Sequence, residues 1–398
     1  MAERPPVTNW SSDFDHTDPR WVNDPYPIWD ELRKKCPIAH TDRFNGVYFP
    51  SRHDDVRAVA YDPEHFSSRR VVVRETALPP VATPPITSDP PEHAPARRLL
   101  LPAFSPNAIK RLEPRTRQIC TELIDRLIDR GECDAAIDYA QHIPVRVIAC
   151  MLGIPEEDGD QFRAWIHMSL EQGITDYEKA MQALGEISVY FRKEIARRGE
   201  RRGDDLISFL LDAELEGRPL SETHLLGTLR LLLVAGIDTT WSAIGASLWH
   251  LAQHPEDRAR LAADPGLIPT AVEEFLRAYS PVTMAREVVK ETEVNGCPFK
   301  PGQMVFLSFP SANRDPEVFP DPDKVLIDRA ENRHAAFGLG IHRCLGSNLA
   351  RLEMRVALEE WMRRIPDFSL RDPGAVTWSQ GTVRGPRRLP VTFPAVSR

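Results

Sequence analysis

The sequence lacks any continuous apolar stretch long enough to cross a membrane. Its longest strongly apolar run, residues 231–237, lies between Arg230 and Asp238, whereas a membrane-spanning helix needs about 20 apolar residues. The amino terminus, residues 1–6, also lacks the apolar core of a secretory signal. We therefore predict a water-soluble chain that works in the cytoplasm and does not bind a membrane.

The sequence also lacks an excess of positive charge. It has 50 Lys and Arg residues against 58 Asp and Glu residues, a formal net charge of -8. A negative net charge disfavours non-specific attraction to nucleic acid or to anionic lipid. We predict no nucleic-acid partner, and any basic surface must be local.

Several cofactor motifs are missing as well. The six cysteines form no CxxC pair and no metal-finger spacing, which argues against a zinc finger or an iron–sulfur centre. There is no Walker loop and no GxGxxG dinucleotide motif. Any reaction that consumes electrons must therefore receive them from another protein or from a domain outside this chain.

The 398 residues contain no internal repeat and no Ser/Gly-rich linker, so we predict one large domain over residues 1–398. Apolar residues at spacings of three and four dominate the chain. The predicted helices cover residues 109–130, 143–152, 160–171, 176–198, 224–251, 269–278 and 345–365. The predicted strands are residues 46–50, 286–294, 304–308 and 391–393, with Asn295-Gly296 as a hairpin turn. The predicted fold class is mainly α with small β-sheets.

Two long segments, residues 69–91 and 312–334, show no periodicity and are rich in proline or in Asp, Pro and Asn. Loops of this length are usually functional or disordered. The first is a candidate wall of a binding site because Val71 and Ile86 lie among its prolines. The alternative is a surface crossing without a role.

The most informative segment is Phe-Gly-Leu-Gly-Ile-His-Arg-Cys-Leu-Gly at residues 337–346, directly before a predicted helix. Cys344 is predicted at the helix start, where amide N–H groups, the helix dipole and Arg343 lower the pKa of a thiol. Gly338 and Gly340 let the backbone pass close to something flat or bulky. One thiolate cannot build a zinc or iron–sulfur site, but it suffices as the axial ligand of a haem iron. The alternative is a buried structural cysteine beside ordinary turn glycines.

This segment resembles the cysteine loop of the cytochromes P450, the haem-thiolate monooxygenases. The family pattern Phe-Gly-x-Gly-x-His/Arg-x-Cys-x-Gly is matched at Phe337, Gly338, Gly340, His342, Cys344 and Gly346. Further family landmarks follow in order from about residue 25 to residue 393. The resemblance implies the cytochrome P450 fold, haem b (iron protoporphyrin IX) as cofactor, Cys344 as the ligand of its iron, and a long helix at about residues 221–254.

A second motif, Ala235-Gly236-Ile237-Asp238-Thr239-Thr240, lies inside that helix. Steps of three and four place Gly236 and Thr239 on its apolar face, while Asp238 lies about 100° around the axis. A buried threonine bonded to its own helix and a surface aspartate are the alternative. The resemblance implies that Asp238 and Thr239 are the acid–alcohol pair that delivers protons, and that Ala235 and Gly236 lie against the haem.

The helix at residues 269–278 carries Glu274 and Arg277. Spacing alone favours an ordinary surface pair between Glu273 and Arg277. The resemblance instead implies that Glu274 and Arg277 are buried and hold the segment that leads to the cysteine loop. The position expected for a third arginine carries Lys324, which leaves two candidates, Arg314 and Arg329.

A haem has two propionates, which need cationic or hydrogen-bonding partners. The residues that resemble the family's anchors are His93, Arg97, Arg286 and His342. Pro95 lies between the first two and is tolerable only in the first turn of a helix. The basic residues Arg97, Arg98, Arg343 and Arg351 are predicted to gather near the thiolate, where they would dock an acidic electron donor.

The resemblance implies a monooxygenase that inserts one atom of O2 into an organic substrate, by hydroxylation or oxidative O-dealkylation. The segment at residues 233–242 looks most like bacterial members fused to a flavin and iron–sulfur reductase, and a separate ferredoxin or reductase is the alternative donor. The predicted pocket walls are residues 69–91, 162–191 and 282–284 with Leu232, Ala235 and Val383, and they imply a small apolar substrate. A peroxide-driven peroxygenase and a haem-thiolate sensor without turnover are the other functions considered.

Overall fold

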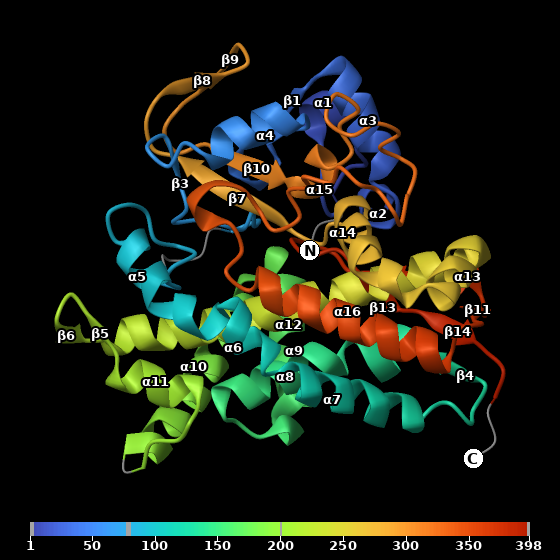
Figure 1. Ribbon diagram of the computed structural model, residues 1–398. Coiled ribbons are helices and arrows are strands. Elements are labelled where there is room, and N and C mark those ends of the chain that lie inside the picture. The colour runs from blue at the N-terminus through green and yellow to red at the C-terminus, as the bar shows by residue number, and fades with distance from the viewer. Residues whose placement is uncertain (1–3, 77–80, 200, 396–398) are drawn as a thin grey trace.

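The computed structural model describes residues 4–76, 81–199 and 201–395 (Figure 1). Helices build most of the described chain. The helices are α1 (Trp10–Asp13), α2 (Pro19–Asn23), α3 (Tyr26–Lys35), α4 (His53–Ala60), α5 (His93–Leu100), α6 (Pro106–Lys110), α7 (Glu113–Asp125), α8 (His142–Leu152), α9 (Gly159–Leu170), α10 (Tyr177–Gly199), α11 (Leu206–Asp212), α12 (Glu222–Gln253), α13 (Pro255–Ala263), α14 (Ile268–Ala278), α15 (Phe309–Ala312) and α16 (Ser347–Arg364).

The strands are short and gather in small sheets. They are β1 (Ile38–Thr41), β2 (Val47–Pro50), β3 (Phe66–Ser67), β4 (Glu132–Asp134), β5 (Glu214–Leu215), β6 (Arg218–Pro219), β7 (Thr283–Val288), β8 (Thr292–Val294), β9 (Cys297–Phe299), β10 (Met304–Ser308), β11 (Ser369–Leu370), β12 (Thr377–Trp378), β13 (Pro386–Arg388) and β14 (Pro390–Thr392). The largest sheet has the order β1-β2-β10-β7-β3. It lies with α1 to α4 in the upper part of Figure 1, apart from the main helical layer.

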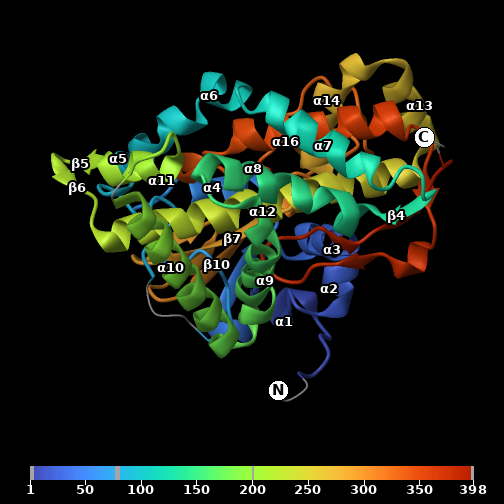
Figure 2. The same ribbon diagram turned by 90° about the horizontal axis from the view of Figure 1, so that it is seen from below.

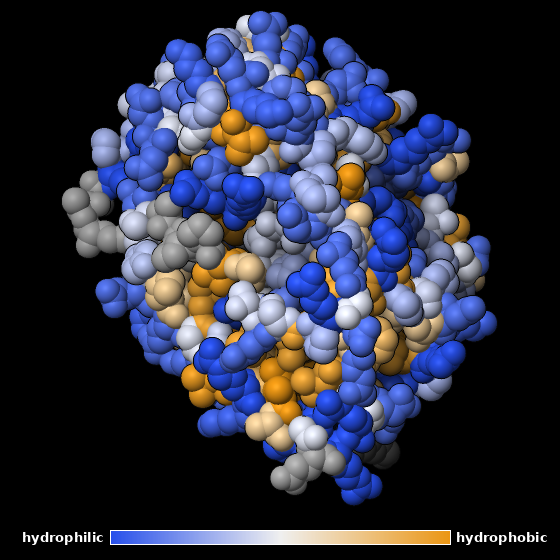
Figure 3. All heavy atoms as spheres, turned by 90° about the vertical axis from the view of Figure 1, so that its left-hand side faces the viewer, coloured by the Kyte–Doolittle hydropathy of each residue, from blue (hydrophilic) through white to orange (hydrophobic). Residues whose placement is uncertain are grey.

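The centre of the helical layer is α12, with α8, α9 and α10 around it (Figure 2). Its 32 residues begin after Ser221, whose hydroxyl accepts from the N–H of His224, and end at Gln253, two residues before Pro255. The helix is long and apolar enough to cross a membrane by length and composition, but 72% of its apolar window is buried inside the protein. That burial is what the core helix of a folded domain shows. The molecular face in Figure 3 is mostly hydrophilic, with apolar patches between charged side chains.

The predicted fold class, mainly α with small β-sheets, is confirmed, and α12 spans nearly the range of 221–254 implied by the resemblance. Several details differ from the prediction. The helix predicted at residues 109–130 is split into α6 and α7, because the chain turns at Leu112 and α7 restarts with Pro114 in its first turn. The strand predicted at residues 286–294 is two strands, β7 and β8.

The Asn295-Gly296 turn is present, with φ values of +49° and +75°. It joins β8 to β9, however, and the strand at residues 304–308 pairs with β7 instead, so that Val305 lies opposite Arg286. The long segment between α15 and the cysteine loop has no regular helix or strand from residue 313 to residue 339 among the residues described.

This irregular segment is held by a buried ion cluster on α14. Glu274 and Arg277 are both 0% exposed. The Nε and Nη2 groups of Arg277 each donate to the Glu274 carboxylate at 2.8 Å. Arg277 also donates to the backbone carbonyls of Asn313, Pro322 and Lys324 at 2.8 to 3.0 Å. One arginine therefore supplies hydrogen bonds to three backbone carbonyls that have no partner within a helix or a sheet.

The third member of the cluster, after Glu274 and Arg277, is Arg329. Its Nε donates to Glu274 Oε2 at 3.0 Å, whereas Arg314 pairs with Asp323 and donates to the Ala278 carbonyl. Spacing alone was misleading at Glu273, which pairs with Arg351 at 2.6 Å rather than with Arg277. Tertiary packing places Arg277 on the buried side, out of reach of Glu273.

Replacing Glu274 by Ala leaves Arg277 and Arg329 buried without a carboxylate, so we expect the free energy of unfolding to fall by about 3–5 kcal/mol. Urea denaturation followed by far-UV circular dichroism measures this loss. The control is Glu64→Ala, which breaks an exposed pair with Lys290 and should leave the free energy of unfolding nearly unchanged, because water screens exposed ion pairs. Equal losses in the two variants would contradict the structural role of the cluster.

Candidate active site

A cavity lies between α12 and the cysteine loop, in the middle of the molecule. It is lined by Leu232, Ala235, Gly236 and Thr239 of α12, by Arg97 and Leu100 of α5, by Met284 and Arg286 of β7, and by Phe337, Gly338, Leu339, His342 and Cys344 of the loop. The loop and α12 thus face each other across one space, although they are about a hundred residues apart in the sequence.

The cysteine loop closes on itself through its backbone. The N–H of Cys344 donates to the carbonyl of Phe337 at 2.7 Å, and Gly338 and Gly340 have φ values of +72° and +69°. Only Gly338 of these two glycines lines the cavity. A Cβ at Gly340 would overlap the carbonyl oxygen of Ala60, so Gly340 allows the loop to approach the end of α4.

The thiol of Cys344 is accessible from the cavity. The surrounding protein nevertheless withdraws it from bulk water, and this desolvation raises the pKa of Cys344 above its ordinary value. The N–H of Gly346 and the charges of Arg97 and Arg343 act in the other direction without outweighing it. The predicted lowering of the thiol pKa is therefore wrong for the free side chain. The predicted helix start is also displaced, because α16 begins at Ser347.

A bound metal changes that balance, because a coordinating thiol gives up its proton to the metal's charge. Cys344 is thus suited to be an iron ligand, and it has the open space in front of it that a macrocycle needs. Phe337 lies in the same wall, with the guanidinium of Arg351 4.3 Å from its ring centroid.

Two arginines at one edge of the cavity have no carboxylate partner among the described residues. Arg97 donates to the carbonyl of Arg343 at 2.6 Å, and Arg286 donates to the carbonyl of Ala285 at 2.8 Å. Burial lowers the pKa of Arg286 to about 10, so it stays charged at neutral pH. Two partly buried cations without counter-ions favour an anionic group between them.

Two histidines lie near this edge, of which His342 lines the cavity and His93 packs against it from behind the wall. The rings of His93 and His342 meet edge to face with centroids 4.4 Å apart, and the Nε2 atom of each is buried without a hydrogen-bond partner. Burial, with Arg286, His93 and Arg97 nearby, lowers the pKa of His342 to about 3. Such orphaned polar atoms are rare in native proteins. The four predicted anchors therefore fit the two propionates of haem b, and Pro95 lies in the first turn of α5 as predicted.

The structure places Thr239 at the cavity wall, and its hydroxyl donates to the carbonyl of Ala235 at 2.9 Å. That bond is the one expected of an ordinary helical threonine, but Thr239 lines the same cavity as Cys344. Ala235 and Gly236 line the same cavity. Gly236 also packs against Ile148 of α8, 3.3 Å from where its Cβ would lie.

Asp238 points elsewhere. It is 0% exposed and does not belong to the cavity wall. Its Oδ1 lies 2.8 Å from Nη2 of Arg387, an ion-pair distance. Burial raises the pKa of Asp238 to about 6 despite Arg387. Arg387 also donates to Glu171 at 2.8 Å, so a chain of charges runs from α12 to the end of α9.

Sequence reasoning missed Arg387 because it lies on β13, about 150 residues after Asp238, and nothing in the local pattern marks it. A second cavity adjoins the first and shares Leu231, Ala235, Thr239 and Met284 with it. Its walls include Val71, Leu170, Val282 and Val383, from the segments predicted to form the pocket. It also contains arginines that the prediction of an apolar pocket did not include.

Comparisons with known proteins identify the family of this chain. A family model described as cytochrome P450 matches residues 159–264 and 266–374. Nocardicin C N-oxygenase from Nocardia uniformis subsp. tsuyamanensis is 38% identical over 384 residues, covering 93% of this chain and 96% of that protein. Vitamin D(3) 25-hydroxylase from Pseudonocardia autotrophica is 36% identical over 383 residues, with 94% of each chain covered.

A solved cytochrome P450 structure shows the same fold. The cytochrome P450 PksS of the Bacillus subtilis 168 bacillaene polyketide synthase is similar to this chain with a TM-score of 0.88 at 34% identity, covering 96% of this chain and 99% of that one. Fold and relatives together define a haem-thiolate oxidoreductase. The chain belongs to the cytochrome P450 family and is a monooxygenase that uses haem b, O2, electrons from a redox partner and an organic substrate.

If the cationic edge holds the propionates, replacing Arg286 by Gln will weaken haem binding by about tenfold to a hundredfold, the usual worth of a hydrogen bond to a charged group. The rate of haem transfer to apomyoglobin measures the change. Arg371→Gln, which removes an exposed arginine paired with Glu132, is the control for lost charge. An unchanged rate of haem transfer in the Arg286 variant would show that Arg286 does not bind a propionate.

Proposed function

We propose that Cys344 is the axial ligand of the haem iron and that Thr239 and Asp238 deliver protons during the monooxygenase reaction. The observation that carries this proposal is the shared cavity, in which the Cys344 thiol and the Thr239 hydroxyl lie in the walls formed by the loop and by α12. The substrate we propose is a small, largely apolar organic molecule that is hydroxylated or oxidatively O-dealkylated. The single domain over residues 1–398 includes ends outside the described residues and stays a prediction.

Bound haem supplies the iron at which dioxygen is activated, and a thiolate ligand favours cleavage of the O–O bond. The protein supplies the surroundings. The Gly346 N–H and nearby arginines stabilise negative charge on the sulfur of Cys344. His93, Arg97, Arg286 and His342 bind the propionates. Phe337, Gly338, Ala235 and Gly236 shape the space for the flat ring and exclude water from it.

Thr239 holds a hydroxyl in the cavity that can accept and pass on a proton. Asp238, one residue earlier, is the proton source in this proposal, because a pKa of about 6 lets it gain and lose a proton near neutral pH. Its carboxylate faces Arg387, so a change of side-chain rotamer or an intervening water is needed to reach Thr239. Arg387 and Glu171 provide the link toward the surface.

Electrons must come from a separate or fused partner, and we propose a ferredoxin or a flavin and iron–sulfur reductase. Of the four basic residues predicted to form the docking patch, Arg98 and Arg343 are exposed. Arg97 and Arg351 are partly engaged within the protein, with the Arg343 carbonyl and with Glu273. The docking patch is therefore smaller than predicted. The likeness to members fused to a reductase stays a prediction, and so does the cytoplasmic location.

A peroxygenase or a sensor without turnover is less favoured. The relatives reported above are named as an N-oxygenase and a hydroxylase, and the alcohol of the proton-delivery pair lies in the cavity wall. A peroxide-driven enzyme would be expected to dispense with that pair.

Replacing Cys344 by Ala should abolish the thiolate-type difference spectrum of the reduced protein with carbon monoxide, because no other cysteine among the described residues lines the cavity. Cys150→Ala removes an exposed cysteine on α8 and should leave the spectrum intact. A normal thiolate spectrum in the Cys344 variant would refute the ligand assignment and with it the proposed function.

Replacing Thr239 by Ala should leave haem binding intact while product formed per electron pair falls on the order of tenfold or more, the lost fraction appearing as peroxide. Oxygen uptake, peroxide and product are measured together with a substrate that shifts the haem spectrum. Thr223→Ala changes an exposed threonine in the first turn of the same helix and serves as the control. Unchanged coupling would exclude Thr239 from proton delivery.

A further inference from the structure

The second cavity, next to the haem site, is lined by four arginines and by no acidic side chain among the described residues. The arginines are Arg69, Arg70, Arg74 and Arg230, in walls that are otherwise mainly Val, Leu, Ile and Thr. The protein as a whole carries a net charge of -8, so this concentration of cations is a local feature.

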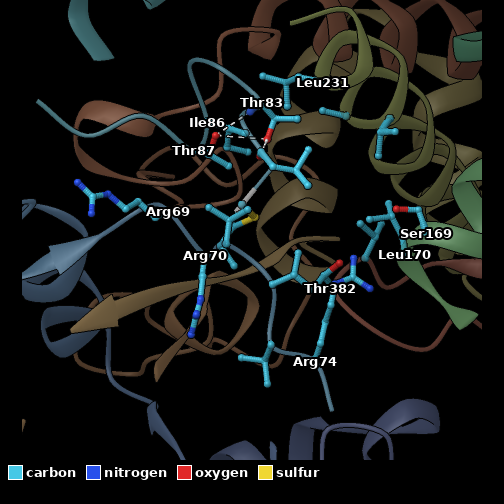
Figure 4. A pocket seen from close by; sticks show the side chains of 18 of the residues that line it. Arg69, Arg70, Arg74, Thr83, Ile86, Thr87, Ser169, Leu170, Leu231 and Thr382 are labelled. Carbon is cyan, nitrogen blue, oxygen red and sulfur yellow. Dashed lines mark hydrogen bonds between the residues drawn. The ribbon is translucent and has the colours of Figure 1, made fainter. Parts of the chain in front are cut away.

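Two of the four arginines have carboxylate partners. Arg69 lies 3.6 Å from Asp89, and Arg70 lies 3.7 Å from Glu287. Arg69 is also 72% exposed in its side chain. In Figure 4 both side chains extend away from the part of the pocket where Arg74 lies. These two cations are neutralised by the protein or by water and do not need a ligand.

Arg74 differs from them. Its Nη1 donates to the carbonyl of Gly173, and no carboxylate among the described residues lies within ion-pair distance of it. Desolvation lowers the pKa of Arg74 to about 10, so the guanidinium is still charged at neutral pH. Figure 4 shows its head beside Thr382 and on the same side as Ser169 and Leu170. A partly buried cation whose only acceptor is one carbonyl leaves most of its five N–H groups free for another partner.

Arg230 adds positive charge to the same cavity. It donates to the Ser188 hydroxyl at 3.2 Å and to the Ala82 carbonyl at 3.1 Å, and its Nε is buried without an acceptor. It lies nine residues before Thr239 on α12, which is about 14 Å of helix rise. Arg230 therefore already donates to two acceptors and keeps a free Nε–H, whereas Arg74 donates to one carbonyl and has more donors available.

Resting on the function proposed above, we infer that the substrate carries a carboxylate and that Arg74 binds it, while the apolar body of the substrate extends toward Thr239 and the haem. A guanidinium matches the planar carboxylate through two parallel N–H···O bonds. Arg74 thereby becomes a residue that determines specificity, and the apolar walls position the rest of the molecule for oxidation.

Isothermal titration calorimetry on the holoprotein at pH 7.5 tests the inference. The probes are decanoate and 5-phenylpentanoate, each compared with its neutral carboxamide. We expect at least one acid to bind about tenfold to a hundredfold more tightly than its amide. In Arg74→Gln this preference should disappear, with the amide affinity unchanged, and Arg74→Lys should keep part of it. Arg260→Gln removes an exposed, ion-paired arginine outside the cavity and should keep all of it.

The inference would be overturned if neither decanoate nor 5-phenylpentanoate bound more tightly than its amide. It would also be overturned if the preference for acid over amide survived in Arg74→Gln. The carbon monoxide difference spectrum of the same wild-type preparation keeps this result separate from the proposed function. A normal thiolate spectrum without any preference for acids refutes the role of Arg74 alone. Loss of that spectrum refutes the haem-thiolate assignment instead. The comparison of acid with amide in the wild type stands even if a variant fails to fold.

Discussion

The buried carboxylate of Glu274 is the interaction on which the site depends. It neutralises Arg277 and Arg329, and it also accepts from the N–H of Leu326 at 2.8 Å. Arg277 in turn holds the carbonyls of the irregular segment that precedes the cysteine loop. Asn313, one of those carbonyl partners, accepts from the N–H of Ala335 through its side chain at 2.6 Å. A chain of polar contacts therefore leads from α14 to the start of the loop that presents Cys344. A segment without helix or strand cannot hold such a position by its own backbone bonds.

The second constraint is electrostatic. Cations lie buried or partly buried along both cavities without carboxylate partners among the described residues, at Arg97 and Arg286 near the cysteine loop and at Arg74 and Arg230 beyond it. Withdrawing a charged side chain from water without a counter-ion is unfavourable unless a ligand of opposite charge binds to it. In the first cavity the propionates of haem b fit that need. The second cavity also has positive charge without a matching carboxylate, and for this reason we infer an anionic group on the substrate.

The parts of the site that follow from short sequence windows were predictable. The loop around Cys344, the helical position of Thr239 and the anchors His93, Arg97, Arg286 and His342 were all identified through local motifs that resemble a known family. The buried pair of Glu274 and Arg277 was identified from the resemblance, whereas helical spacing alone favoured a surface pair between Glu273 and Arg277, because spacing says which residues are neighbours but not which face is buried. The lowered pKa expected for Cys344 was wrong because desolvation outweighs the nearby charges.

The sequence by itself determined the chemistry that is available: one thiol in a glycine-containing loop, an acid and an alcohol in adjacent positions of a helix, and a mainly helical chain. Only the tertiary structure decided which groups meet. It turned Asp238 toward Arg387, chose Arg329 over Arg314 as the third member of the cluster, and left Arg74 without a counter-ion. Each of these outcomes depends on segments distant in the chain, because burial and ion pairing are set by packing in space and not by the order of residues.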